Sequence, residues 1–356
     1  MTRTAISAVL GLGLFVGSSF GATYNVDAAG GKDFVSIGEA FAVAADGDSI
    51  VVWPGTYAGE NNRDIEWGDR NIVLTKAPDR QTPVIDLGGT GRFLVIESDV
   101  VDSSSVIHGL EIRNGSAPPP SLGGGAIRIL PHQGRGASLV IELCTFVSND
   151  AASGGAVEAI DSDVTVRFCR FLGNTGEYTG GLVLAGCRSV VNGCLFLDNT
   201  ATIVGGALRC GANEDEYPII RACTFARNGS PQGGAIAITQ YSHPTLERCV
   251  IALSTEGAGV STEGSAATEI THSIVYANAG GDSLPANHHD NLFRDPLFCD
   301  PGSDDFAVCE DSPALAGYNP WGLAVGSTSY GCPPCDTPVE ASTWGVIKAL
   351  YRRAGE

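Results

Sequence analysis

Basic side chains are scarce in this sequence, and so are long apolar runs after its first 22 residues. The chain has 21 lysines and arginines against 40 acidic residues, a net charge of −19. A surface this acidic should repel nucleic acid and anionic membranes. No apolar run after residue 22 could span a membrane, and the apolar runs of residues 109–280 are too short for a helical stripe of period 3.6. We therefore expect neither a nucleic-acid-binding protein, nor a transmembrane helix, nor a helical repeat.

The one apolar stretch of interest stands at the beginning of the chain. Residues 1–22 combine Arg3 with an apolar core, and the small residues Ser19 and Gly21 lie near a plausible cleavage point. This arrangement is typical of a signal peptide. We expect a protein that is secreted or held at the cell surface or outer envelope of a bacterium.

What the sequence has in abundance is a short repeat. Its leading cysteines are separated by 25, 25, 29 and 26 residues, and Ser273 takes the same place 24 residues later. A fixed period of this size is the signature of a solenoid. Short runs of period two, such as Val164, Val166 and Phe168, indicate strands, and about three short strands close one coil. The prediction is a parallel β-helix.

In such a fold each recurring residue forms a column along the stack of coils. The cysteines and phenylalanines should point inward. The asparagines should sit at turns, tolerating left-handed backbone angles and bonding to the amides above and below. Glycine pairs at 154–155, 180–181, 205–206 and 233–234 should give the next turn its backbone angles. The columns are Cys144, Cys169, Cys194, Cys223, Cys249; Phe146, Phe171, Phe196, Phe225; and Asn149, Asn174, Asn199, Asn228, Asn278.

The alternation of FVSN, FLGN, FLDN and FARN with GGA(I/L/V) resembles the repeat of polymorphic outer-membrane proteins. The whole chain is similar to secreted bacterial right-handed β-helix proteins of the pectate-lyase-like superfamily. The resemblance implies an all-β, right-handed parallel β-helix with an N-terminal capping helix and an irregular C-terminal closing segment. It also implies adhesion at a cell surface, the role of the polymorphic proteins.

The chain divides into five parts on this interpretation. In the cap, Phe34, Ile37, Phe41 and Ala44 should form one face of a short helix covering the first coil. The parts are a signal peptide at 1–22, the cap and first coils at 23–108, regular coils at 109–298, a cysteine-containing closing segment at 299–337 and an amphipathic tail at 338–356.

Eleven cysteines in a secreted chain suggest disulfides, and the odd number leaves at least one free. We expect buried thiols in the repeat column, where side chains lie parallel. Cys299 and Cys309, outside the repeat, are better disulfide candidates. Cys332 and Cys335 form CPPC, which is compatible with a redox motif, a metal half-site or a tight local disulfide, and the structural role is favoured.

No cluster of acids stands out among the outward positions. The position two residues before each leading cysteine alternates acid and base, and the position three residues after each glycine pair is mixed. His288, His289 and Asp290 could form a metal or acid-base site, but a solvated turn is favoured. The two columns are Glu142, Arg167, Asn192, Arg221, Glu247 and Glu158, Leu184, Arg209, Ala237.

These features favour a non-catalytic β-helix that binds glycan or protein. Tyr178, Tyr217 and Tyr241, near turns, could stack on sugar rings. The alternatives are a polysaccharide-degrading enzyme, either a lyase or a glycoside hydrolase, and a structural envelope component. Catalytic residues are not identifiable. We expect a monomer without cofactor or metal, although calcium is compatible with the acidic surface.

Overall fold

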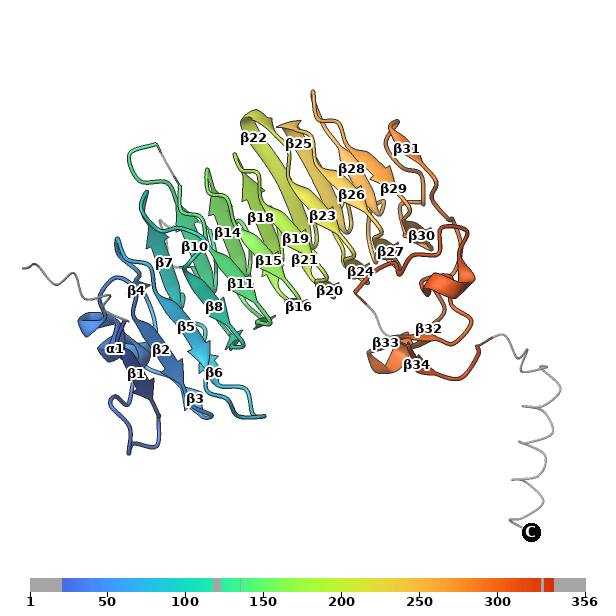
Figure 1. The fold of residues 1–356 in the computed structure, drawn as a ribbon. Coiled ribbons are helices and arrows are strands. Elements are labelled where there is room, and N and C mark those ends of the chain that lie inside the picture. Colours follow the sequence, from blue (N-terminus) through green and yellow to red (C-terminus); the bar gives the residue numbers. More distant parts are fainter. Residues whose placement is uncertain (1–20, 118–122, 135, 328–329, 336–356) are drawn as a thin grey trace, which may run out of the picture.

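The computed structural model describes residues 21–117, 123–134, 136–327 and 330–335, with the side chains of 212–215 left out. Its body is a parallel β-helix of about 11 coils (Figure 1). Three parallel sheets, named A, B and C here, run the length of the stack, and the chain visits them in the order A, B, C in each coil.

The strands of sheet A are β1 (Thr23–Val26), β2 (Ser49–Val52), β5 (Val73–Lys76), β8 (Val106–His108), β11 (Val140–Glu142), β15 (Thr165–Arg167), β19 (Val190–Asn192), β23 (Ile219–Arg221), β26 (Thr245–Glu247), β29 (Glu269–Thr271) and β31 (His288–His289). Those of sheet B are β3 (Thr56–Tyr57), β6 (Val84–Asp86), β9 (Glu111–Arg113), β12 (Thr145–Val147), β16 (Arg170–Leu172), β20 (Leu195–Leu197), β24 (Thr224–Ala226), β27 (Val250–Ala252) and β30 (Ile274–Tyr276). Those of sheet C are β4 (Ile65–Glu66), β7 (Leu94–Glu97), β10 (Ile127–Leu130), β14 (Val157–Ile160), β18 (Leu182–Ala185), β22 (Leu208–Glu216), β25 (Ile236–Ser242) and β28 (Val260–Thr262).

Smaller elements complete the fold. Between sheets B and C, three short strands pair: β13 (Asp150–Ala151), β17 (Thr175–Gly176) and β21 (Thr200–Ala201). The closing segment has β32 (Phe298–Asp300), β33 (Asp305–Cys309) and β34 (Tyr330–Cys332). Helical turns are α1 (Ile37–Val43), η1 (Glu60–Asn62), η2 (Pro301–Ser303) and η3 (Ala316–Tyr318).

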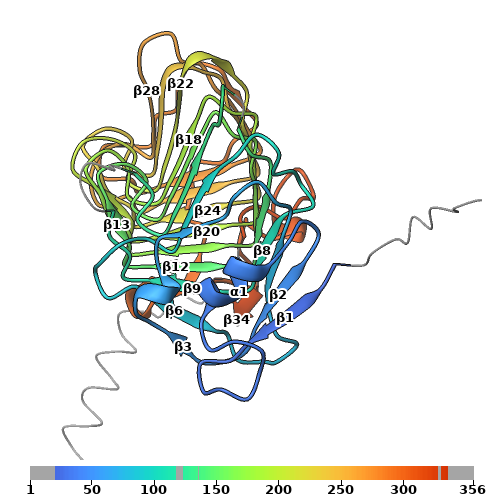
Figure 2. The same cartoon turned by 90° about the vertical axis from the view of Figure 1, so that its left-hand side faces the viewer.

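Helix α1 covers the first coil, as the sequence predicts, but it begins at Ile37, so Phe34, predicted on the same helical face, lies before it in a bridge with Val26. Seen along the stack, it lies across the open end of the β-helix (Figure 2). Ile37, Phe41 and Ala44 are buried, and the Phe41 ring centroid lies 5.3 Å from that of Trp67. The helix thus shields the apolar interior of the first coils from water.

The predicted phenylalanine column lies inside the β-helix. Phe146, Phe171, Phe196 and Phe225 occupy equivalent positions on neighbouring sheet B strands and are fully buried. Their ring centroids are 4.6 to 4.9 Å apart, and the ring planes of the last two pairs are nearly parallel. The rings therefore stack at the spacing of the strands themselves.

The asparagine column is a continuous hydrogen-bonded ladder. Asn149 donates from its side chain to Asn174 Oδ1 at 3.0 Å, Asn174 to Asn199 at 2.9 Å, and Asn199 to Asn228 at 3.0 Å. In each step the backbone N–H of one asparagine also donates to the Oδ1 of the next. The ladder satisfies amides that are otherwise buried.

One part of the asparagine prediction is wrong. The left-handed residue at this corner is the one before each asparagine: Ser148, Gly173, Asp198 and Arg227 have φ between 51° and 58°. The left-handed residue turns the chain, and the asparagine that follows points inward. Hydrogen bonding, rather than backbone tolerance, therefore explains the choice of asparagine.

The cysteine column forms a second ladder, at the corner between sheets A and B. The backbone N–H of Cys169 donates to Cys194 Sγ at 3.4 Å, and that of Cys194 to Cys223 Sγ at 3.5 Å. Ser273 Oγ accepts from Cys249 N at 3.0 Å. All these thiols are buried and unpaired in disulfides. Burial raises the pKa of the Cys249 thiol to about 12, which makes it unreactive.

The two glycines of a pair have different roles: the first adopts a left-handed backbone angle, and the second allows close approach of the next coil. Gly154, Gly205 and Gly233 have φ between 58° and 67°. At Gly155 and Gly206 a Cβ would lie 2.1 to 2.2 Å from a backbone oxygen of the next coil. Gly180 lacks the left-handed angle because Thr179, not Gly180, stands opposite Gly154.

This one-residue shift corrects a predicted column. Val183, not Leu184, pairs with Glu158 and Arg209 on sheet C. Leu184 is an inward, fully buried residue. The outward column is therefore Arg128, Glu158, Val183, Arg209, Ala237 and Ser261.

Two polar segments belong to the sheets. Most of GANEDEYP, at residues 211–218, lengthens β22, which pairs with the long β25 through an irregularity between Ala212 and Glu216. The NHHDN segment contains β31, which pairs with β29. Asn291 Oδ1 then accepts from Ser273 N at 2.9 Å and extends the corner ladder by one coil.

The closing segment packs on the outer face of sheet B. Phe298, Phe306, Val308, Ala314 and Val325 form an apolar cluster with outward residues of the later sheet B strands. Arg227 joins the two parts, pairing with Asp198 at 2.6 Å and also with Asp304. Sheet B can carry apolar residues on its outer face because this segment covers them.

Two disulfides hold the closing segment, Cys299–Cys332 and Cys309–Cys335. The tight local disulfide considered for CPPC does not form, because Cys332 pairs with Cys299 and Cys335 pairs with Cys309. The predicted signal peptide and the C-terminal tail lie outside the described residues, apart from the last residues of the former.

We predict that Phe171→Ala and Phe196→Ala each lower the free energy of unfolding by about 3 to 5 kcal/mol, because each leaves a cavity between stacked rings. Phe168→Ala is the matched control, since that side chain is 51% exposed. Chemical denaturation measures all three. Equal losses for Phe168 and Phe171 would contradict the stacking.

Asn174→Ala should also be strongly destabilising. It removes a side chain that makes four hydrogen bonds, to the backbone and side chain of Asn149, to Phe146 O and to Asn199 Oδ1. Each buried group left unsatisfied costs about 1 to 3 kcal/mol. Asn192→Ala, on the outer face of sheet A, should be nearly neutral. The same denaturation measurement would reject the ladder if the two variants were alike.

Thiol titration tests the cysteine assignment. Protein denatured without reductant should show the seven free cysteines, and reduction should raise the count to all eleven. Before denaturation these thiols should not react at pH 8, because all seven are buried and the reagent cannot reach them. A count below seven would indicate disulfides within the solenoid.

Candidate functional site

The outer face of sheet C carries charged side chains that are largely shielded from water. Glu158 on β14 pairs with Arg128 on β10, with Nε to Oε2 at 2.9 Å, and only 6% of the Glu158 side chain is exposed. Gly123 lies directly against this carboxylate, since a Cβ there would meet Glu158 Oε2 at 1.8 Å. The glycine therefore lets the backbone cover the ion pair closely.

Arg92 lies on the same side of the molecule, one coil earlier. It is 5% exposed, and its Nε donates to Gly124 O at 3.2 Å. Burial lowers the pKa of Arg92, and the nearby charge of Arg128 lowers it further. Positive charge thus gathers here on a chain that is acidic overall.

Arg209, on β22, is the unusual member of the column. It stands two coils from Glu158, about 9.6 Å along the stack, with Val183 between them. Its Nε is buried without a hydrogen-bond partner, and no ion pair joins its guanidinium to any described residue. Burial lowers the pKa of Arg209, and the carboxylate of Glu158 opposes that shift. The side chain is a mostly buried cation without a direct counter-ion.

The three tyrosines named as sugar-binding residues are all exposed, by 40% to 53%. Tyr178, between β17 and β18, interacts electrostatically with Arg209. Tyr217 directly follows β22 and stacks on His243 with ring centroids 5.5 Å apart, and Tyr241 lies in β25. Of the three, only Tyr178 is placed by a described interaction beside the Arg209 column.

Sheet A shows the predicted alternation of charge on its outer face. Arg167 pairs with Glu142 at 2.9 Å, and both are solvent-accessible. His289 pairs with Asp290 at 2.9 Å and with Glu269 at 3.4 Å, and these bonds raise the pKa of His289. Exposed pairs of this kind contribute little energy, and they hold no enclosed site.

A groove of about 410 Å³ runs between the closing segment and sheet B. Phe168, Arg170 and Leu195 line one wall, and Asp304 to Ala307 line the other. The Phe168 ring lies over Gly193, where a Cβ would come within 2.7 Å of it. Covering this glycine accounts for the exposed ring.

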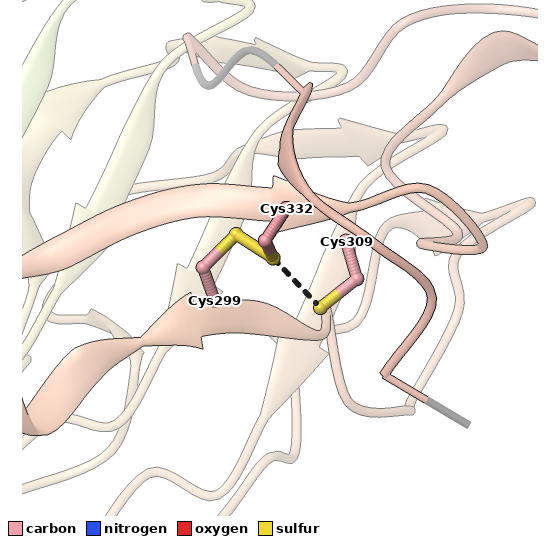
Figure 3. Close-up of side chains that lie close together, drawn as sticks. All are labelled: Cys299, Cys309 and Cys332. Carbon is pink, nitrogen blue, oxygen red and sulfur yellow. Dashed lines mark hydrogen bonds between the residues drawn. A yellow bond between two sulfur atoms is a disulfide. The ribbon is translucent and has the colours of Figure 1, made fainter. Parts of the chain in front are cut away.

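Among the described residues, one group of three metal-ligating side chains is close enough to share an ion, and it consists of Cys299, Cys309 and Cys332. These cysteines are shown in Figure 3 and belong to the closing segment. The acidic residues of the described sheets form no comparable group.

The sequence points to the Arg209 column but misplaces its members. Counting three residues from each glycine pair places Leu184 in the outward column between Glu158 and Arg209, where the structure places Val183. The signal that was available is an arginine in the repeat with no acid at the equivalent position of either neighbouring coil. How far Arg209 is shielded from water depends on the folded structure, which the repeat does not specify.

In the described part of the chain, no helix has the length and apolar character needed to cross a membrane. No protein-family model matches the chain, and no curated protein matches it either.

The chain is similar to three solved structures at low sequence identity. A pectate lyase, Pel9A, superposes with a TM-score of 0.55 at 14% identity, over 88% of this chain and 98% of the lyase. A rhamnogalacturonan lyase gives 0.41 at 12% identity over 91% and 99% of the two chains. The pectin methylesterase of Aspergillus niger gives 0.43 at 12% identity over 83% and 93%. The chain is thus similar to pectate lyase in fold, an all-β parallel β-solenoid.

Proposed function

We propose that the protein engages an acidic polysaccharide, with an anionic sugar group bound by Arg209 on the outer face of sheet C. The observation that carries this proposal is the partly buried Arg209 side chain, whose Nε is shielded from water without a hydrogen-bond partner and which forms no ion pair with a described residue. Shielding a charge from water without a partner costs folding free energy, on the order of several kcal/mol when burial is complete. Binding of an anion beside Arg209 would recover part of that free energy. A planar guanidinium suits a carboxylate in particular.

The surroundings of Arg209 support an extended ligand. Neighbouring coils repeat every 4.8 Å or so, which offers a chain of sugars similar positions in succession. The exposed Tyr178 ring is available for stacking on a sugar face. The fold likeness to an enzyme named pectate lyase agrees with this ligand class but does not specify it.

Cleavage of the bound chain is a second candidate function. Glu158 carries it, because it is a carboxylate in the same column as Arg209 and is shielded from water. A lyase needs a base to remove a proton and a cation to neutralise the adjacent sugar carboxylate. Glu158 and Arg209 are the described residues suited to those two tasks.

Adhesion rests on the resemblance of the repeat, and secretion rests on residues 1–22. We retain secretion to the cell surface or exterior as part of the proposal, because an extracellular polysaccharide would be met there. The described residues add no protein-binding surface to the adhesion hypothesis.

The test is an affinity measurement on polygalacturonate and on its methyl-esterified form. Wild-type protein should prefer the free acid, and Arg209→Met should weaken binding at least tenfold because the cation is lost. The same variant should raise the melting temperature, because it replaces an unpaired buried charge with an apolar side chain. Arg221→Met, exposed on sheet A, is the matched control and should change neither quantity.

Two results would overturn the proposal. One is equal binding of the free and esterified polymers by the wild type, and the other is unchanged affinity in Arg209→Met. Product release from polygalacturonate, compared between wild type and Glu158→Gln, separates cleavage from binding alone. Binding without any product would leave the protein as a recognition module.

A further inference from the structure

Four cysteines from three strands converge in the closing segment. Cys299 lies in β32, Cys309 ends β33, Cys332 ends β34, and Cys335 follows three residues later. The sulfur atoms of Cys299, Cys309 and Cys332 all lie within 4.8 Å of one another. Figure 3 shows the Cys299–Cys332 disulfide beside Cys309, and the Cys332 Sγ and Cys309 Sγ atoms are 3.4 Å apart. Two disulfides with sulfurs this close form one four-sulfur cluster.

We propose that these four cysteines, when both disulfides are reduced, bind one Zn²⁺ ion as a tetrathiolate site. Zinc takes four thiolates tetrahedrally at about 2.3 Å, which places neighbouring sulfurs about 3.8 Å apart. In the oxidised protein the Cys299 and Cys332 sulfurs are bonded to each other and Cys332 Sγ lies 3.4 Å from Cys309 Sγ, so small movements after reduction would bring the sulfurs to that spacing. The two-residue spacing between Cys332 and Cys335 is also typical of one half of a zinc site.

Contacts other than the disulfides hold the cysteines in place. Strand β33 pairs antiparallel with β32 and parallel with β34, so three of the four cysteines sit in one small sheet. Glu310 N donates to Cys332 O at 3.2 Å. Cys335 N donates to Asp311 Oδ1 at 3.0 Å. The reduced thiols would therefore remain near one another while the sheet persists.

The other cysteines of the chain are arranged differently. Those of the corner ladder lie one to a coil along a line, and Cys194 Sγ and Cys223 Sγ each accept a backbone N–H of the preceding coil. In the described residues, the closing segment alone brings three potential ligand atoms so close. The arrangement thus singles out this cluster as the metal site.

Zinc and the disulfides exclude each other by stoichiometry. A dithiol or phosphine reductant supplies two electrons to each disulfide, and each then gains two protons to become two thiols. Zinc binding displaces the thiol protons, and reoxidation by a small disulfide would form both bridges again and release the ion. The site would thus keep the closing segment ordered in a reducing environment, as the disulfides do in an oxidising one.

The test uses the full chain and Co²⁺ as a spectroscopic substitute for Zn²⁺. Protein reduced with a phosphine should bind one Co²⁺ and show the intense visible absorption of a tetrahedral thiolate centre, which Zn²⁺ should then abolish. Oxidised protein should show no such band. Reoxidation with a small disulfide should release the bound zinc, as measured with a colorimetric chelator. These readouts involve no polysaccharide, so they are independent of the proposed function.

Cys332→Ser should lose the cobalt band, while Cys187→Ser, a buried free cysteine of the solenoid, should retain it. If Cys332→Ser fails to fold by circular dichroism, Cys335→Ser replaces it, because Cys335 is exposed and its loss disturbs no core. Absence of the band in folded, reduced wild-type protein would overturn the proposal. A band that persists in the serine variant, or that oxidised protein shows equally, would do the same.

Discussion

The structure depends on one hydrogen bond repeated along two corners: a backbone N–H of one coil donates to the inward side chain of the next. At one corner the acceptor is an asparagine oxygen, and at the other it is a cysteine sulfur or the serine oxygen of Ser273. Both acceptors follow a residue with left-handed backbone, which turns the chain. Without these side chains, the backbone N–H groups at the two corners would be buried without hydrogen-bond partners. The two ladders therefore fix the register of the whole stack.

Because the ladders and the phenylalanine stack stabilise the coils, the residues on the outer faces of the three sheets can differ. The outer face of sheet B is apolar in the later coils and is covered by the closing segment. Sheet A carries exposed, self-paired charges. Sheet C carries the buried ion pair of Arg128 and Glu158 and the unpaired Arg209. Among these features, the charge without a direct partner lowers stability most. Features that lower stability often serve a function, so Arg209 is the strongest candidate for ligand binding.

The closing segment and sheet C have separate tasks on this view. The segment blocks the apolar face of sheet B and is held by Arg227 and by the four-sulfur cluster. Its attachment is therefore a matter of stability and redox state. Sheet C lies on another side of each coil, so ligand recognition by Arg209 does not require the segment to move.

The repeat by itself determined the fold class, the inward phenylalanine and cysteine columns and the existence of an asparagine ladder. A period of 25 residues leaves room for one coil, and only inward residues are constrained to recur. Tertiary structure decided the rest. The shift of one residue at Gly180, which replaces Leu184 by Val183 in the outward column, appears only when Thr179 is seen opposite Gly154. The pairing of Cys332 with Cys299 and of Cys335 with Cys309 depends on how three strands meet in space. The isolation of Arg209 depends on which side chains the folded coils bring near it, and no local sequence pattern specifies them.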